Sequence, residues 1–438
     1  MIMKKKYQTI HTKRFIFLIL SFITVFALFI RVKYIEHTVI DNPIRADARQ
    51  YVIYGYNIYS HGTFSQELSS KPQPDSYRSP GYPFLISLAF IIGGKHGFYP
   101  LVIYFQTILS ALLIPLSFFV GRRFLPLFWS VFAALLVAVS PHLISMTSYL
   151  LTETLFSFIL LAAIHSFYLS LEKKHFFYFI VSGILFGFAY LTNETALFIP
   201  FLFAAFFVYY TKNIRRKSIT TRLFFNIFLY LLVFLLFPAC WIWRNHNLSS
   251  DAAHGSSRAI ATLSHGAYPD FVYKNEKFKY FPYREDPMQP AFGSTFENFS
   301  KILFERFQER PIRYLSWYLF EKPYYLWSWN ILQGQGDVYV YPVTSSLYTI
   351  YPLANWTRML MKYLHPVILL TTLIGILICC FKIIRKDNSL DLLNFPFVII
   401  IYYTVLYTVF APWPRYSVPL RPELYLFALW AVKACLSA

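Results

Sequence analysis

Ten apolar stretches divide this chain, and they limit what it can fold into more than any other feature of the sequence. They cover residues 15–30, 101–120, 124–140, 154–171, 176–191, 195–210, 223–243, 365–381, 392–410 and 424–438. A helix that crosses a bilayer needs about 20 mostly apolar residues, and flanking residues can extend a shorter apolar core. The pattern therefore predicts an all-α polytopic membrane protein with about ten transmembrane helices.

The composition agrees with this prediction, because 57% of the residues are hydrophobic and only 14% are charged. A soluble domain is about 25% charged. The formal net charge of +19 would in a soluble protein indicate a nucleic-acid partner. Here most of that charge lies in short runs between apolar stretches, so we expect the lipid bilayer as a partner and no nucleic acid.

The basic residues also orient the chain. With the basic start at 1–14 in the cytoplasm, alternation places the loops around Arg122, Lys173, Arg215 and Arg385 inside. The inside segments hold 18 of the 40 Lys and Arg residues but only 3 of the 21 acids. This bias follows the positive-inside rule and predicts a cytoplasmic N-terminus.

Two segments on the opposite side are too long to be simple connections, and we expect function to lie there. The sequence divides into an N-terminal transmembrane catalytic module (1–243) that contains the first outer loop (31–98), a long outer-face loop (244–364), and C-terminal transmembrane helices (365–438).

Both outer loops contain helical patterns of aromatic and apolar residues, and the apolar run at 84–94 is too short to cross a bilayer. In the first loop the patterns lie at 46–59 and 84–94, and in the second at 311–332, which is rich in Trp and Tyr. Counting 311–332 as a further span would place Lys382 and Arg385 outside, against the charge bias. We therefore predict interfacial helices in both loops.

Charged side chains recur near the outer ends of the predicted spans. They are Asp47, Arg78, Glu153, Arg244 and Lys322. Carboxylates beside cations at a lipid boundary suit a reaction on a phosphorylated lipid. A carboxylate deprotonates an acceptor hydroxyl, and the cations neutralise a departing phosphate. The sequence has no phosphate-binding GxxxxGK[ST] loop, no GxGxxG and no HExxH. A divalent metal would be chemically compatible, but the sequence does not support one, and no cofactor is expected.

Each of these residues also has a purely structural interpretation. Asp47 opens a helical pattern and would serve as its N-cap, and Glu153 with Thr152 would cap the fourth span. Arg244 and Arg415 would be interfacial anchors, which is the default for a single arginine at the membrane edge. Spacing alone does not separate these interpretations from catalysis.

The order of motifs resembles the C-type glycosyltransferase superfamily. Within it, the bacterial branch related to protein mannosyltransferases and to aminoarabinose transferases of lipid A is most similar. The shared features are a basic start and one span, an outer-loop acid before an aromatic helix (Asp47), R-x-P-G-Y-P (from Arg78), T-E opening the fourth span (Glu153), W-x-x-R-N (around Arg244) and R-Y-x-x-P (from Arg415). The similarity runs over most of the chain.

The resemblance implies transfer of a sugar, with inversion, from a polyprenyl-phosphate donor at the outer, periplasmic face of a bacterial inner membrane. Asp47 would be the catalytic base or its close partner, and Glu153 would match the acid of the second outer loop. Arg78 would face the donor phosphate, and Arg244 would be a second phosphate or sugar contact. The acceptor stays open between a lipopolysaccharide or other glycolipid, a glycan, a small lipid and a protein.

Two positions depart from the pattern of that superfamily. Asp47 is followed by Ala48 instead of a second acid, which weakens any metal-bridging role. Before the sixth span many members have a basic residue, whereas this chain has Asn193 and Glu194. The pattern therefore does not predict a phosphate contact at that point.

Two other function classes share the same overall composition. A transporter or flippase of lipid-linked sugars is disfavoured, because coupled transporters place ionisable residues within their spans. Here the predicted spans contain only His165 and Lys433, besides His365 at the first position of the eighth span. A non-catalytic envelope assembly factor is the second alternative, and the sequence does not exclude it.

Overall fold

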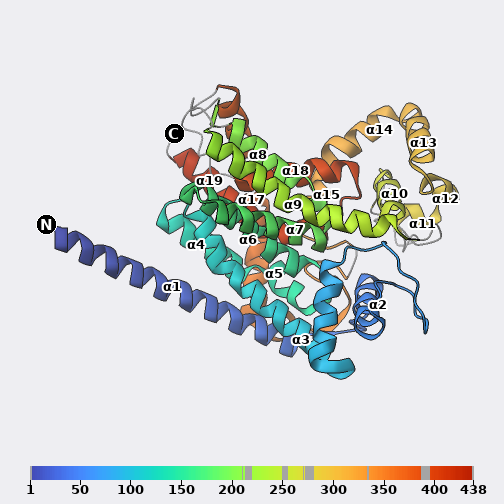
Figure 1. The fold of residues 1–438 in the computed structure, drawn as a ribbon, viewed down its shortest axis with the longest axis horizontal. Coiled ribbons are helices and arrows are strands. Elements are labelled where there is room, and N and C mark those ends of the chain that lie inside the picture. Colours follow the sequence, from blue (N-terminus) through green and yellow to red (C-terminus); the bar gives the residue numbers. More distant parts are fainter. Residues whose placement is uncertain are drawn as a thin grey trace.

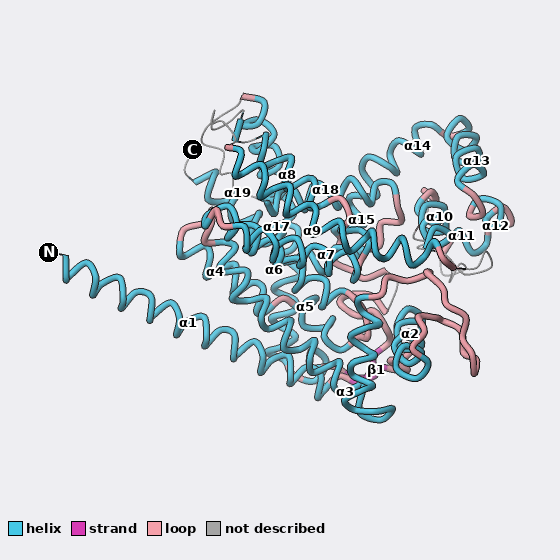
Figure 2. The backbone as a smooth tube through the Cα atoms, in the orientation of Figure 1, coloured by secondary structure: helices cyan, strands magenta, loops and turns pink. Residues whose placement is uncertain are grey.

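The computed structural model describes residues 2–209, 211–212, 220–248, 255–269, 271, 281–332, 335–385 and 395–436. These residues are mostly helical, and two short strands, β1 (Val39–Ile40) and β2 (Val343–Ser345), pair antiparallel. In Figure 1 several long helices pack into one bundle, and the segment from α10 to α14 lies at the end opposite the N-terminus. Figure 2 shows how little of the backbone is strand. The predicted all-α architecture is confirmed.

Each predicted span corresponds to a helix. These helices are α1 (Ile2–His37), α3 (Gly81–Gly121), α4 (Leu127–Val139), α6 (Glu153–Lys173), α7 (Phe176–Thr192), α8 (Ile199–Tyr209), α9 (Thr221–His246), α17 (Pro352–Ile384), α18 (Phe395–Val409) and α19 (Arg421–Leu436). The predicted spans 195–210, 392–410 and 424–438 extend beyond the described residues, and so do Arg215 and its loop.

Not all of these helices are long enough to cross a bilayer alone. By length and hydropathy, α1, α3, α6, α9 and α17 qualify, and α4 qualifies together with α5 (Pro141–Ser145) and η1 (Met146–Ser148), across a bend of 47°. Three shorter apolar stretches cover α7, α18 and η2 (Glu194–Ala196) with α8. The total of ten spans therefore stays a prediction, while the polytopic membrane class is clear.

The helix expected at 84–94 is not a separate element. It forms the first part of α3, which bends at Gly94, where φ is 61° and ψ is −166°. A positive φ is open to glycine at little cost because it has no Cβ. The chain therefore turns from the first outer loop into the second predicted span without a loop between them.

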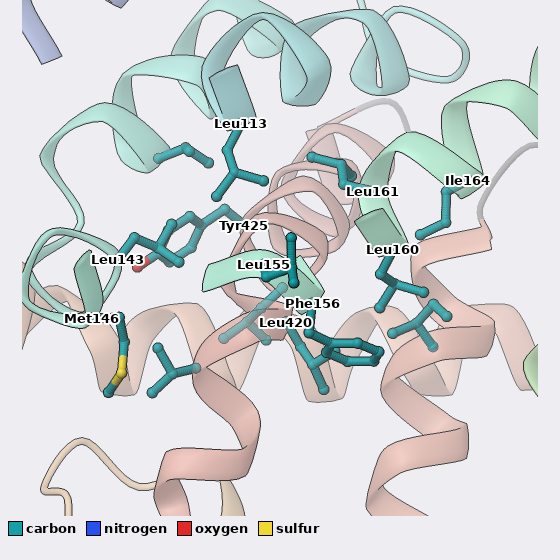
Figure 3. Packing of buried hydrophobic residues seen from close by; sticks show 14 of the residues in the cluster. Leu113, Leu143, Met146, Leu155, Phe156, Leu160, Leu161, Ile164, Leu420 and Tyr425 are labelled. Carbon is teal, nitrogen blue, oxygen red and sulfur yellow. The ribbon is translucent and has the colours of Figure 1, made fainter. Parts of the chain in front are cut away.

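The core of the bundle joins segments that are far apart in the sequence. In Figure 3, Leu113 of α3 and Tyr425 of α19 lie side by side, and Leu160 of α6 lies farther across the same buried cluster. Between membrane helices, van der Waals packing contributes more than exclusion of water does, because lipid tails are as apolar as leucine. The cluster fixes the ends of α6 and α19, which flank the polar site described below.

A buried arginine stabilises the break between α4 and α5. Arg31 near the end of α1 is fully buried and donates to the carbonyls of Val137 and Ala138 at 3.1 and 3.0 Å and to the hydroxyl of Ser110 at 2.8 Å. A break in a membrane helix frees carbonyls that lipid cannot satisfy. Arg31 supplies those donors, so the broken span stays inside the protein.

The second outer loop has a hydrophobic core of its own. Its helical elements are α10 (Gly255–Gly266), α11 (Pro282–Glu285), α12 (Gln289–Phe292), α13 (Phe296–Glu309), α14 (Pro311–Ser316), η4 (Trp317–Glu321), α15 (Lys322–Trp327) and α16 (Leu347–Ile350). Phe271 and Trp317 are buried there against Trp413 from the C-terminal part. The predicted helix at 311–332 ends at Trp327, and it is not among the candidate membrane spans.

Candidate active site

The centre of the site is one carboxylate shared by two arginines. Asp47 lies in α2 (Ala46–His61), and its two oxygens accept from Arg78 and Arg415, each at 2.6 Å. The Nε atom of Arg415 also lies 2.9 Å from Glu153, an ion-pair contact too bent to be a hydrogen bond. The structure thus brings Asp47, Arg78 and Glu153 close to one another, with Arg415 between the two acids.

The helix that carries Asp47 is not capped by it. The N-cap is Arg45, which makes no side-chain capping bond, and Ala46 has a φ of 46°, which is uncommon for a residue with a Cβ. The Tyr341 hydroxyl accepts from the Ala48 amide at 3.4 Å and donates to the Arg45 carbonyl at 3.1 Å. Because a tyrosine from the second outer loop binds this turn, the carboxylate of Asp47 is free to pair with the arginines, and the N-cap interpretation is wrong.

Glu153, the second acid of the site, also pairs with an arginine. Glu153 is the first residue of α6, and its side chain is only 7% exposed. Thr152, at the N-cap position, makes no capping bond with its side chain. The cap interpretation is therefore not supported here either, and the closest charged partner of Glu153 is Arg415.

A tight turn positions Arg78. At Gly81 a Cβ atom would lie 2.8 Å from the Thr192 hydroxyl and 2.9 Å from the Leu191 carbonyl, so only glycine allows α3 to begin against the end of α7. Arg78 lies just before that turn, donates to Gln50 at 2.7 Å and stacks over Tyr51 at 5.2 Å from its ring centre. These contacts aim the guanidinium at Asp47.

The charges at this centre reinforce one another. Burial by itself would raise the pKa of the Asp47 carboxyl, but Arg415 and Arg78 outweigh it and hold that pKa well below its usual range. Burial would lower the pKa of Arg415, and the opposing charges of Glu153 and Asp47 keep it above the usual value. Asp47 is therefore a carboxylate at any physiological pH and, while both arginines bind it, a weak base.

A cavity of about 280 Å³ opens beside these groups, and we refer to it as the first cavity. Its polar side contains Arg78, Glu153 and Arg415. Its apolar side is formed by α18, by residues just before α8 and by the residue just after α18, with Leu197, Phe198, Leu406 and Phe410. Phe198 is 56% exposed on the outside of the bundle. The cavity therefore combines anion-binding groups with an apolar wall at a lipid-facing surface.

A second ion pair lines the same cavity. Arg258 of α10 binds Glu194 of η2, and the Ser79 hydroxyl donates to the same carboxylate. Glu194 occupies a position where many members of the superfamily have a basic residue. In this chain the second outer loop supplies a basic residue there, Arg258. No motif in the sequence marks Arg258, since it is brought to the site only by the packing of α10.

The structure does not bring Arg244 or Lys322 into this cavity. Arg244 donates to the carbonyls of Phe64 and Asp75 in the first outer loop. Lys322 is fully buried and donates to the carbonyls of residues 408–410 at the end of α18, at 2.8, 3.1 and 3.3 Å. Burial lowers the pKa of Lys322 well below its usual range. Both cations bind backbone, and neither contacts the acids.

Arg415 is the residue that sequence reasoning assigned to the wrong role. It lies in η5 (Pro414–Leu420), is buried and bridges two acids, so its interpretation as an interfacial anchor is wrong. The R-Y-x-x-P motif was the available signal. Tyr416, the next residue, also lines the first cavity. Across the described ranges, no group of three or more His, Cys, Asp or Glu side chains is arranged to hold a metal ion.

The fold is that of the C-type membrane glycosyltransferases. The oligosaccharyltransferase AglB of Archaeoglobus fulgidus, in complex with an inhibitory peptide and a dolichol-phosphate, aligns over 97% of this chain and 51% of its own. The TM-score is 0.52 at 14% identity. The same enzyme tethered with an acceptor peptide aligns over 97% of this chain and 50% of its own, with a TM-score of 0.51 at 14% identity. ArnT of Cupriavidus metallidurans bound to undecaprenyl phosphate aligns over 95% of this chain and 60% of its own, with a TM-score of 0.49 at 12% identity.

Residues 73–243 match the family model described as dolichyl-phosphate-mannose-protein mannosyltransferase. The matched segment includes Arg78, Glu153 and Glu194. No protein of curated function matches the chain in sequence. The chain spans about half the length of AglB. The resemblance to the C-type superfamily is thus confirmed for the fold, and the reaction has to be argued from the site.

Proposed function

We propose that this protein is an inverting glycosyltransferase that moves a sugar from a polyprenyl-phosphate donor to an envelope acceptor. The observation that carries the proposal is the sharing of Asp47 by Arg78 and Arg415, both of which line a cavity with an apolar wall. Such a site offers a base, cations for a phosphate and a surface for a lipid chain. The AglB structure in complex with a dolichol-phosphate supports a lipid phosphate as ligand of this fold.

The donor would bind with its two parts on the two sides of the first cavity. Its phosphate would accept hydrogen bonds from Arg78, Arg415 and Arg258, because arginine matches phosphate oxygens bidentately. Its polyprenyl chain would leave along Leu197 and Phe198 toward the lipid. A lipid-linked sugar reaches such a site by lateral diffusion in the bilayer, whereas a nucleotide sugar would have to come from water.

Binding of the phosphate would also activate the base. In the empty site the two arginines hold the pKa of Asp47 below its usual range, despite its burial. A phosphate that takes over those guanidinium groups removes the stabilisation of the carboxylate, so the pKa of Asp47 rises. A base is most effective when its pKa is near the working pH. Asp47 would therefore become an effective base only once the donor is present.

The proposed step is a direct displacement at the anomeric carbon of the donor sugar. Asp47 accepts the proton of the acceptor hydroxyl, the hydroxyl oxygen bonds to the anomeric carbon, and the bond from that carbon to the phosphate oxygen breaks. Polyprenyl phosphate leaves with its charge neutralised by arginines. Glu153 would hold Arg415 in place during this exchange. Attack opposite to the leaving phosphate gives inversion.

We place this reaction at the outer, periplasmic face of a bacterial inner membrane, with the N-terminus in the cytoplasm. The placement rests on the positive-inside bias of the short loops. Arg244 and Lys322 are left out of the phosphate site, because both bind backbone carbonyls. The acceptor would be a glycan, a glycolipid or a protein.

Purified protein in detergent tests the proposal. We expect it to release polyprenyl phosphate from a polyprenyl-phosphate sugar once envelope membranes are added as acceptor. Arg78→Lys keeps the charge and loses the bidentate geometry, so it should slow release about tenfold or more. Turnover with a nucleotide sugar alone would contradict the donor assignment. Movement of the lipid between leaflets without sugar transfer would favour a flippase, and neither activity would favour an assembly factor.

A further inference from the structure

A second cavity, of about 290 Å³, adjoins the first one. Five residues line both cavities: Arg78, Ser79, Glu194, Arg258 and Ala259. Three of them are bound together, since Arg258 pairs with Glu194 and Ser79 donates to the same carboxylate. The two cavities therefore share one wall, and that wall contains Arg78, the partner of Asp47.

The remaining lining of the second cavity differs from that of the first. It includes Ser76, Tyr190, Trp241 and Asn245. The apolar residues of α18 that line the first cavity do not line the second. The second cavity lies where α7 and α9 end and α3 begins, which is the outer end of these helices in the predicted orientation. It suits a polar ligand with flat apolar faces better than a lipid chain.

Trp241 is held rigidly at this cavity. The guanidinium of Arg244 lies 5.0 Å from its ring centre, and Phe64 packs edge-on at 5.2 Å. Arg244 also donates to the Asn245 side chain at 3.0 Å and does not line the cavity itself. Its place in the W-x-x-R-N motif is thus explained: it orients the aromatic ring and the amide that do line the cavity.

We propose that the second cavity binds a sugar unit of the acceptor. An aromatic ring with a nearby amide and hydroxyls offers a stacking surface and hydrogen bonds, as a sugar ring requires. The inference rests on the proposed transfer reaction. Inversion requires the attacking hydroxyl and the leaving phosphate on opposite faces of the donor sugar. Two cavities that share a wall containing Arg78 give the acceptor and the donor separate approaches to the arginine that binds Asp47. The acceptor is therefore a glycan or glycolipid.

Two tryptophans on the same helix allow a matched test. Trp241 lines the second cavity, whereas Trp243 is 72% exposed and lines neither cavity. The assay follows transfer of labelled sugar from a polyprenyl-phosphate sugar to envelope membranes from cells that lack the protein, at increasing membrane concentration. A parallel titration gives the Kd for polyprenyl phosphate.

We expect Trp241→Ala to raise the half-saturating membrane concentration about tenfold, as removal of an aromatic anchor does. Its Kd for polyprenyl phosphate should change less than twofold. Trp241→Phe should restore most of the affinity, and Trp243→Ala should match the wild type. The inference is overturned if Trp241→Ala has the half-saturating membrane concentration of the wild type, or if its Kd for polyprenyl phosphate rises by the same factor as that concentration. It is also overturned if the labelled sugar appears on protein. In each of those cases wild-type transfer persists, whereas failure of the proposed function would abolish it.

Discussion

Basic side chains behave differently at the centre of the site and at its edge. At the centre, Arg78 and Arg415 bind the carboxylate of Asp47 at 2.6 Å. At the edge, Arg244 and Lys322 bind backbone carbonyls. A carboxylate and a phosphate are both anions with several acceptor oxygens, so one can replace the other on a guanidinium. A backbone carbonyl has no such substitute.

The difference separates exchangeable cations from structural ones. All four residues lie near the predicted outer face and carry the same formal charge. Charge and the W-x-x-R-N motif make Arg244 look equivalent to Arg78 in the sequence, and charge alone does so for Lys322. What distinguishes them is the partner that each has in the folded chain. Removing a central arginine should impair phosphate binding and catalysis. Removing an edge cation should impair folding and, for Arg244, also the binding of the acceptor.

The largest effect should follow from Arg415→Gln. This change leaves Asp47 and Glu153 without the cation between them, and breaking a buried pair costs about 3 to 5 kcal/mol. We expect loss of sugar transfer by at least 1000-fold together with lower abundance in the membrane. Arg415→Lys restores the charge, and it should recover abundance more than activity. Wild-type transfer by Arg415→Gln would show that the bridge has no part in the reaction.

A smaller effect, on stability only, is expected for Lys322→Met. The side chain keeps its length, but the carbonyls of residues 408–410 lose their donor, at a cost of about 1 to 3 kcal/mol. The melting temperature in detergent should fall, while the Kd for polyprenyl phosphate stays within twofold of the wild type. A large increase in that Kd at unchanged melting temperature would return Lys322 to the phosphate site.

The smallest expected effect is the dependence of the melting temperature on pH. The folded pKa of Asp47 is lower than its unfolded value of about 3.9, so its ion pairs stabilise the fold fully above that value. That contribution is lost as the pH falls through the lower, folded pKa. We expect the difference in melting temperature between wild type and Asp47→Asn to be constant from pH 8 to about 5 and to shrink only below about pH 4. A change between pH 6 and 7 would mean that the carboxyl of the empty site titrates there.

Most of the helices could be predicted from the sequence, because an apolar run of sufficient length has few other structures available in a membrane. The pairing of side chains could not. Arg415 and Asp47 are separated by 368 positions, and whether an arginine at a membrane edge faces lipid or an acid depends on how η5 packs against α2 and α6. Motif order located Asp47, Arg78 and Glu153, while Arg258 depended on the fold of a loop that has no motif.

The first outer loop shows a similar limit. The apolar pattern at 84–94 was correctly identified as helical, but nothing in hydropathy distinguishes a separate surface helix from the start of a bent span. Gly94 was the residue that mattered, because its positive φ lets α3 continue through the bend. A helix boundary of this kind is set by backbone geometry, which an apolar pattern does not record.

The central claim is that a donor phosphate replaces Asp47 on Arg78 and Arg415, and a titration of polyprenyl phosphate into wild type and Asp47→Asn tests it most directly. Removing the competing charge should make Asp47→Asn bind polyprenyl phosphate more tightly than the wild type, about tenfold or more. Sugar transfer should fall about 100-fold to 10,000-fold through loss of the base. Weaker binding by Asp47→Asn, or tighter binding with full transfer activity, would contradict the account.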